Sequence, residues 1–88
     1  MRYRTHPDLS CRVIDGEAVI LQVSTTTYYS LNPTGTALWE KMRDGATRDE
    51  LIEALLKEFE IDRAKAEADV DALLTDLVQE KLVLAEAL

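Results

Sequence analysis

Near its N-terminus the chain carries the dipeptide Asp15-Gly16, with apolar-rich segments on both sides. Both central residues of a type I′ turn need positive φ, which Gly and Asp tolerate better than most residues, so this dipeptide predicts a two-residue β-hairpin. It separates CRVI at residues 11–14 from EAVILQVS at residues 17–24. Two antiparallel strands therefore follow from one turn.

A third short strand is expected after a second turn at residues 25–27. The segment Tyr-Tyr-Ser-Leu at residues 28–31 is rich in residues that favour strands. Side chains alternate between the two faces of a strand. In the second strand this gives one wholly apolar face, and the opposite face turns polar toward its end. We expect the wholly apolar face, which consists of Val19, Leu21 and Val23, to need a cover.

Capping signals place the first two helices. Asn32 can cap a helix that begins at Pro33, where the missing proline N–H is no loss, and this helix is predicted to end at residue 43. Thr47 and Glu50 match a capping box, in which each side chain satisfies a backbone donor at the start of a second helix. The apolar positions of the second helix then follow helical spacing: Leu51, Ile52, Leu55, Leu56 and Phe59.

A third helix is predicted over residues 63–80, with Asp62 as its cap. At about 100° per residue, its core stripe centres near Val70 and Leu77. The apolar segment at residues 82–84 follows this helix, and we expect it to lie extended over the sheet.

One sheet and three amphipathic helices suit a chain of 88 residues that forms a single small domain. The predicted fold class is α+β, a three-stranded antiparallel meander followed by three helices, which resembles a winged-helix unit. Within it we expect an N-terminal arm at residues 1–9, the main domain at residues 10–84 and a C-terminal tail at residues 85–88.

The charge of the chain argues against a nucleic-acid partner. The formal net charge is −7, and residues 1–43 carry a net +1, which leaves −8 for residues 44–88. Binding to phosphates depends on clustered Lys and Arg that release counterions, and the second half has no such cluster. A winged-helix transcription regulator, the rival with the same topology, would need a basic recognition helix. The third predicted helix instead carries a net charge of −3.

Known catalytic and metal-binding patterns are missing from the sequence. It has no glycine-rich phosphate loop and no nucleophile elbow, and His6 and Cys11 are the only residues of their kinds. One thiol and one imidazole cannot build a tetrahedral zinc site, so Cys11 is interpreted as a half-buried strand residue. We therefore predict no enzyme activity, no metal and no cofactor. Without an apolar segment long enough for a membrane span or a signal peptide, the cytoplasm is the expected location.

A surface that binds another chain is the remaining possibility. The third strand comes last in the meander, so one of its edges is free unless the C-terminal segment covers it. An extended peptide could pair with that edge as an added strand. Tyr28 and Tyr29 point to opposite faces, so one of them is expected in the core. A dimer formed through the same edge is the structural alternative.

Residues 28–35, Tyr-Tyr-Ser-Leu-Asn-Pro-Thr-Gly, followed by Trp39-Glu40, resemble the PqqD-like family, whose members are also described as recognition elements for ribosomally made precursor peptides. The preceding hairpin and the two later helices extend the resemblance over about residues 10–84. The resemblance implies a winged-helix-like domain without catalytic activity. Its third strand and third helix would bind the leader of a precursor peptide and present it to a leader protease or another modifying enzyme.

Within the family, the chain resembles both the peptide carrier for the radical enzyme of pyrroloquinoline quinone biosynthesis and the leader-binding proteins of lasso-peptide pathways. The Leu-Asn-Pro-Thr-Gly stretch at residues 31–35 favours the lasso type. For that type the resemblance implies leaders with a Tyr-x-x-Pro-x-Leu element and a separate cysteine protease that removes them.

The resemblance places the peptide on the third strand, and helical geometry leaves two possible flanks of the third helix for the facing wall. One flank presents Asp69, Ala72, Leu73 and Asp76, and the other presents Glu67, Asp71, Leu74 and Val78. We favour the first flank because Ala72 leaves space and the aspartates can accept hydrogen bonds from a peptide. The predicted peptide-binding residues are Thr26, Thr27, Tyr28, Tyr29, Ser30, Leu31, Asp69, Ala72, Leu73 and Asp76.

Overall fold

The computed structural model describes residues 1–87 of the chain. Within this range it contains three helices and two three-stranded antiparallel sheets, which confirms the predicted α+β class. The strands are β1 (Arg2–Thr5), β2 (Leu9–Ile14), β3 (Glu17–Gln22), β4 (Thr27–Ser30), β5 (Ala46–Thr47) and β6 (Val83–Glu86). The helices are α1 (Pro33–Met42), α2 (Arg48–Glu58) and α3 (Arg63–Gln79).

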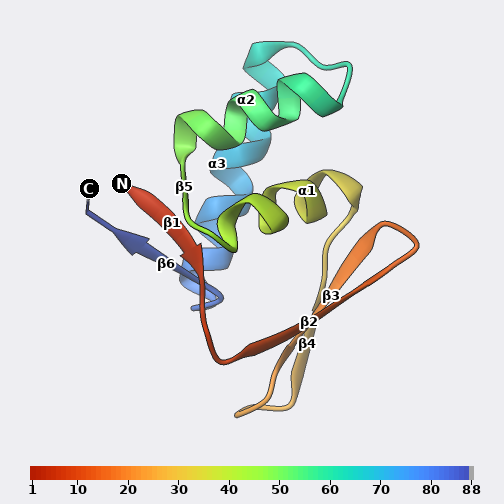
Figure 1. Ribbon diagram of the computed structural model, residues 1–88, viewed down its shortest axis with the longest axis vertical. Helices are drawn as coiled ribbons and strands as arrows, with labels where there is room; N and C mark the ends of the chain where they lie inside the picture. The colour runs from red at the N-terminus through yellow and green to blue at the C-terminus, as the bar shows by residue number, and fades with distance from the viewer. Residues whose placement is uncertain (88) are drawn as a thin grey trace.

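The three predicted strands form one sheet in the order β2-β3-β4. Asp15 and Gly16 have φ values of 52° and 78°, as a type I′ turn requires. β3 pairs with β2 on one side and with β4 on the other in a continuous register. In Figure 1 this meander lies below α1, at the lower right of the molecule.

The predicted caps set the starts of all three helices. The Asn32 side chain accepts a hydrogen bond from the Gly35 N–H at 2.8 Å at the start of α1. Thr47 and Glu50 form both halves of the capping box at the start of α2. Asp62 caps α3 by accepting from the backbone N–H of the third helical residue. Local side-chain chemistry was therefore sufficient to predict where each helix begins.

A second sheet, in the order β5-β1-β6, was not predicted. Its central strand β1 pairs antiparallel with both neighbours, so that Arg2 lies opposite Thr47 in β5 and opposite Glu86 in β6. The segment at residues 82–84 leads into an extended strand as expected, but that strand pairs with β1, so its predicted place over the meander was wrong. The first and last strands, β1 and β6, consequently run side by side (Figure 1).

The second sheet crosses the predicted division of the chain. β1 lies within the expected arm at residues 1–9, and its Tyr3 packs against the core. β6 extends into the expected tail at residues 85–88, whose last residue lies outside the described residues. The main domain at residues 10–84, with a separate arm and tail, stays a prediction.

The helices cover the face of the meander that carries Ala18 and Ile20, both of which are fully buried. The prediction that the opposite, wholly apolar face would be covered was wrong: Val19 and Leu21 are only half-buried, and Val23, which follows β3, is 61% exposed. The small Ala18 allows α1 to approach β3 closely enough for a direct hydrogen bond to its backbone. The buried core is Ile20, Leu38, Trp39, Met42, Ala46, Leu51, Ile52, Leu55, Ala66, Val70, Leu74, Leu77, Leu82 and Val83.

Thr36 joins α1 to the meander and is only 7% exposed. Its Oγ1 accepts a hydrogen bond from the Ala18 N–H at 2.7 Å and donates one to the Leu31 carbonyl at 3.3 Å. Thr36→Val keeps the shape of the side chain but leaves these buried groups without a partner. We expect it to lower the free energy of unfolding by about 1–3 kcal/mol, measured by urea denaturation. Thr36→Ser keeps the hydroxyl and should cost less; an equal loss for both variants would contradict the role of the hydrogen bonds.

Candidate functional site

The outer edge of β4 is unpaired in the part of the chain that the structure describes, because β4 pairs with β3 alone and the C-terminal strand pairs with β1. The Leu31 N–H donates to the Ala18 carbonyl at 2.9 Å. Backbone groups in an antiparallel ladder alternate in direction, so Leu31 and Tyr29 bond toward β3. The N–H and C=O groups of Tyr28 and Ser30 therefore point outward, toward the free edge.

Tyr28 and Tyr29 lie on opposite faces of β4, as expected. Tyr28 is 65% exposed, whereas Tyr29 is half-buried and packs against the core. The Tyr29 hydroxyl donates a hydrogen bond to the Glu80 carboxylate, just after the end of α3, at 3.2 Å. Desolvation, together with this hydrogen bond and the charge of Glu80, raises the pKa of Tyr29. The phenol thus stays a donor that holds β4 beside α3.

A hollow of about 390 Å³ lies along α3, and neither Tyr29 and Glu80 nor the other predicted strand residues line it. It lies between α3, the start of α1 and the connection from α2 to α3. The first predicted flank of α3 lines it, since all four of its members face the hollow. The lining residues are Asn32, Thr34, Gly35, Leu38, Phe59, Ile61, Lys65, Asp69, Ala72, Leu73 and Asp76. We name this hollow and the adjacent edge of β4 the β4–α3 groove.

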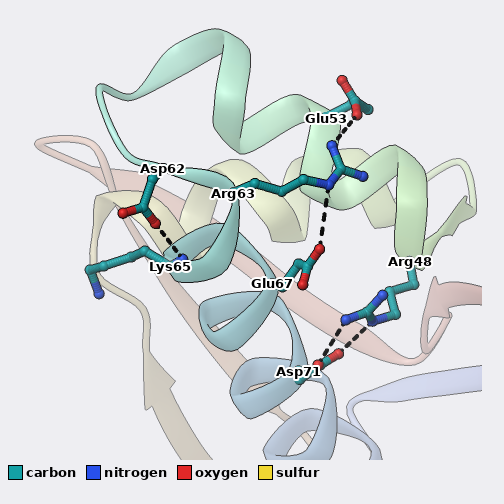
Figure 2. Close-up of polar contacts among 7 residues, drawn as sticks. All are labelled: Arg48, Glu53, Asp62, Arg63, Lys65, Glu67 and Asp71. Atoms are coloured by element: carbon teal, nitrogen blue, oxygen red, sulfur yellow. Dashed lines mark hydrogen bonds and ion pairs between the residues drawn. The ribbon is translucent and has the colours of Figure 1, made fainter.

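The second flank of α3 is engaged within the molecule (Figure 2). Asp71 accepts two hydrogen bonds from the Arg48 guanidinium of α2, at 2.7 and 2.9 Å. Glu67 pairs with Arg63 at 3.3 Å, and Arg63 also reaches Glu53 of α2 at 2.9 Å. These contacts fix α3 against α2 on the side of the helix away from the groove.

The remaining members of the second flank also lie away from the groove. Leu74 belongs to the buried core, and together with Val78 it lines a separate hollow beside residues of β1 and β6. None of the four residues of this flank lines the β4–α3 groove. The geometry therefore distinguishes two flanks that the sequence left open.

The predicted strand platform is shifted slightly at its ends. Thr26 has a φ of 54° and lies in the turn before β4, while Leu31 follows the strand directly and continues its pairing with β3. Thr27 and Ser30 lie in β4 as predicted. Thr26 is turned away from the strand because the link between β3 and β4 needs a residue with positive φ at this point.

Several lining residues of the groove were not predicted. Phe59 and Ile61 come from the connection between α2 and α3, and Leu38 comes from α1. The apolar Ile61, between two acidic residues outside any helical stripe, was a usable signal. Lys65 gave none, because a lysine in the first turn of an exposed helix has no distinguishing pattern.

Other chemistry is not evident at this site. Among residues 1–87, no group of three or more His, Cys, Asp or Glu side chains is placed to hold a metal ion. Cys11 is half-buried in β2, as predicted, and burial is the main cause that raises the pKa of its thiol. No helix in the described range has the length and apolar character to cross a membrane.

The ion pair between Arg48 and Asp71 predicts a pH dependence of stability. The hydrogen bonds from Arg48 lower the pKa of Asp71 in the folded protein. A lowered folded pKa stabilises the fold above the unfolded pKa, near 3.9, and this contribution is lost as the pH falls through the folded pKa. Asp71→Asn should therefore melt below the wild type at pH 7 and converge with it in acid. Arg48→Gln should converge in the same way; a constant difference in melting temperature down to about pH 2 would contradict this assignment.

Fold and site together define a small α+β domain with an open strand edge beside a helix-lined groove, a geometry suited to docking an extended chain. The chain belongs to the PqqD family, because the family model "Coenzyme PQQ synthesis protein D (PqqD)" matches residues 17–83. The resemblance found in the sequence is thereby confirmed. A comparison with curated proteins finds no match.

Two solved structures are similar to nearly the whole chain. One is "TbiB1 in Complex with the TbiA(beta) Leader Peptide", with a TM-score of 0.85 and 27% identity over 96% of this chain and 98% of that chain. The other is "Lasso peptide synthetase B1 complexed with the leader peptide", with a TM-score of 0.81 and 29% identity over 94% and 98% of the two chains. Both similar proteins are thus described in complex with a leader peptide.

Proposed function

We propose that this protein is a non-catalytic adaptor of the lasso-peptide type. It binds the leader of a ribosomally synthesised precursor peptide as a strand added to β4. It then delivers the precursor to a separate processing enzyme, such as a leader protease. The observation that carries this proposal is the unpaired edge of β4 beside the groove, in a chain that matches two leader-peptide complexes over most of its length.

The energetics of the groove suit reversible binding. The outward N–H and C=O groups of Tyr28 and Ser30 allow about four backbone hydrogen bonds, worth about 1 kcal/mol each. Two or three apolar guest side chains buried on Leu38, Phe59 and Leu73 would add about 1.5–3 kcal/mol each. Ordering a flexible peptide costs about 2–5 kcal/mol, which leaves about 2–11 kcal/mol, and the middle of this range corresponds to affinities between millimolar and sub-micromolar. A complex of this strength can form and then release its guest.

Amide hydrogen exchange tests the proposed strand addition at single residues. The probe is a synthetic peptide that carries the Tyr-x-x-Pro-x-Leu element, added to isotope-labelled protein. Before addition, the amides of Tyr28 and Ser30 should exchange faster than those of Tyr29 and Leu31, whose N–H groups face β3. After addition, exchange should slow mainly at Tyr28 and Ser30, and the amide shifts of α3 beside Ala72 should move.

A scrambled peptide of the same composition is the control and should leave these amides unchanged. The proposal fails if the motif peptide leaves Tyr28 and Ser30 unprotected while another surface responds. It also fails if the free protein already protects both amides in a concentration-dependent way, because that result indicates self-association through β4.

A second candidate is the peptide carrier of pyrroloquinoline quinone biosynthesis, which the description of the matching family model favours. Both candidates use the same groove, so they differ in the enzyme that receives the peptide. Reconstitution with a lasso-type leader protease and, separately, with a radical enzyme of quinone biosynthesis distinguishes them. Accelerated leader cleavage supports the lasso type, and acceleration of the radical reaction alone supports the quinone carrier.

A further inference from the structure

The helical wall of the β4–α3 groove is acidic. Asp69 and Asp76 line the hollow from α3, and Glu80 follows at the C-terminal end of the helix, where it contacts Tyr29. The lining contains a single cationic side chain, Lys65, whose Nζ lies 3.1 Å from Asp69 Oδ1. Asp76 has no ion-pair partner within residues 1–87. One carboxylate of the hollow is therefore compensated and the other is not.

The opposite wall offers no compensating charge. Asn32 and Thr34 contribute amide and hydroxyl groups, and Leu38 contributes only apolar surface. The strand β4 itself has the sequence TYYS and carries no charged side chain. A guest that enters the groove therefore meets a mixed polar and apolar surface with an unmatched negative charge at Asp76.

We propose that the guest peptide carries a Lys or Arg side chain that pairs with Asp76. The inference rests on the proposed function and specifies the class of peptide that the groove selects. A guest ammonium or guanidinium forms charge-assisted hydrogen bonds with the Asp76 carboxylate, and protein on one side of the groove reduces the competition from water. A guest carboxylate at the same place is repelled by Asp76.

The charge of the molecule also distinguishes between occupants. A second copy of this chain is a poor occupant, because each copy carries a net charge of −7 and the groove wall of each is acidic. The negative field of the protein attracts a basic peptide and repels an acidic one. This field affects the rate of association as well as the affinity. We therefore assign the groove to a basic peptide segment.

Three synthetic peptides test the charge preference. Each carries the Tyr-x-x-Pro-x-Leu element, with Lys at the x positions in the first, Gln in the second and Glu in the third. Calorimetric titration should rank the affinities Lys above Gln above Glu, with about three- to tenfold between the Lys and Gln peptides in low salt. Raising the salt from about 50 to 500 mM should narrow that gap, because salt screens partly exposed charges.

Two single-charge variants locate the effect. Asp76→Asn should reduce the Lys-over-Gln preference to less than about twofold, and Asp76→Lys should invert it. Glu67→Gln removes the same amount of charge from the far flank of α3, where Glu67 pairs with Arg63. This control should keep the preference of the wild type, since its position does not line the groove.

The titrations test the charge preference, the role of Asp76 and the proposed function separately. Equal affinities for the three peptides would overturn the charge preference and leave the proposed strand addition intact. An equal loss of preference in Asp76→Asn and Glu67→Gln would assign the effect to net charge and overturn the role of Asp76. Failure of all three peptides to bind would overturn the proposed function together with this inference.

Discussion

Tyr28→Pro is expected to weaken binding of the Tyr-x-x-Pro-x-Leu peptide by about 10- to 100-fold and to leave the fold intact. The Tyr28 N–H points away from β3, so proline removes no hydrogen bond from the meander. Proline is tolerated at such edge positions. The same substitution removes a donor to the added strand and leaves a guest carbonyl without a partner, a loss of about 1–3 kcal/mol. Calorimetric titration measures the affinity, and circular dichroism checks the fold.

Val13→Pro is the matched control on the other edge of the meander. The register with β3 directs the backbone groups of Arg12 inward, so those of Val13 point to solvent at the free edge of β2. This variant introduces the same ring at an equivalent edge position, far from the groove, and should bind the peptide like the wild type. Equal losses in the two variants would indicate a general effect of proline on the meander and contradict strand addition at β4.

The sequence was sufficient for those parts of the fold that local chemistry determines. Asp15-Gly16 fixed the first turn, and Asn32, Thr47 and Asp62 fixed the helix starts. The second sheet could not be predicted from the sequence, because β1 pairs with residues near the other end of the chain. A strand of four residues with alternating exposure does not indicate by itself which strand it pairs with. The buried face of β3 was misjudged because apolar content alone does not reveal that Thr36 ties α1 to Ala18.

The candidate site was also predictable only in part. The free edge of β4 and the opposite orientations of Tyr28 and Tyr29 came from the strand order and the two-residue period. Helical angles reduced the wall on α3 to two flanks but could not choose between them. That choice depends on the ion pair between Arg48 and Asp71, which links α2 and α3 across 23 positions of sequence. Side-chain contacts over such distances leave no periodic pattern.

Trp39→Ala should have the largest effect on stability. Trp39 is 2% exposed and belongs to the core between α1 and the meander. Truncating a buried Trp to Ala costs about 3–5 kcal/mol. A domain of this size has a total stability of about 4–13 kcal/mol, at about 0.05–0.15 kcal/mol per residue. The variant should therefore populate the unfolded state measurably. Circular dichroism must follow the urea transition, because Trp39 is the single tryptophan of the chain.

Adding saturating peptide distinguishes the loss of stability in Trp39→Ala from the loss of peptide affinity in Tyr28→Pro. A ligand that binds only the folded state adds about 2.7 kcal/mol of stability at 100 times its dissociation constant. Trp39→Ala keeps the groove, so excess Lys peptide should restore much of its lost stability. Tyr28→Pro should be stable without peptide and gain little from the same concentration, because its affinity is reduced. If peptide fails to raise the urea midpoint of Trp39→Ala while still binding the wild type, Trp39 shapes the groove itself as well as the core.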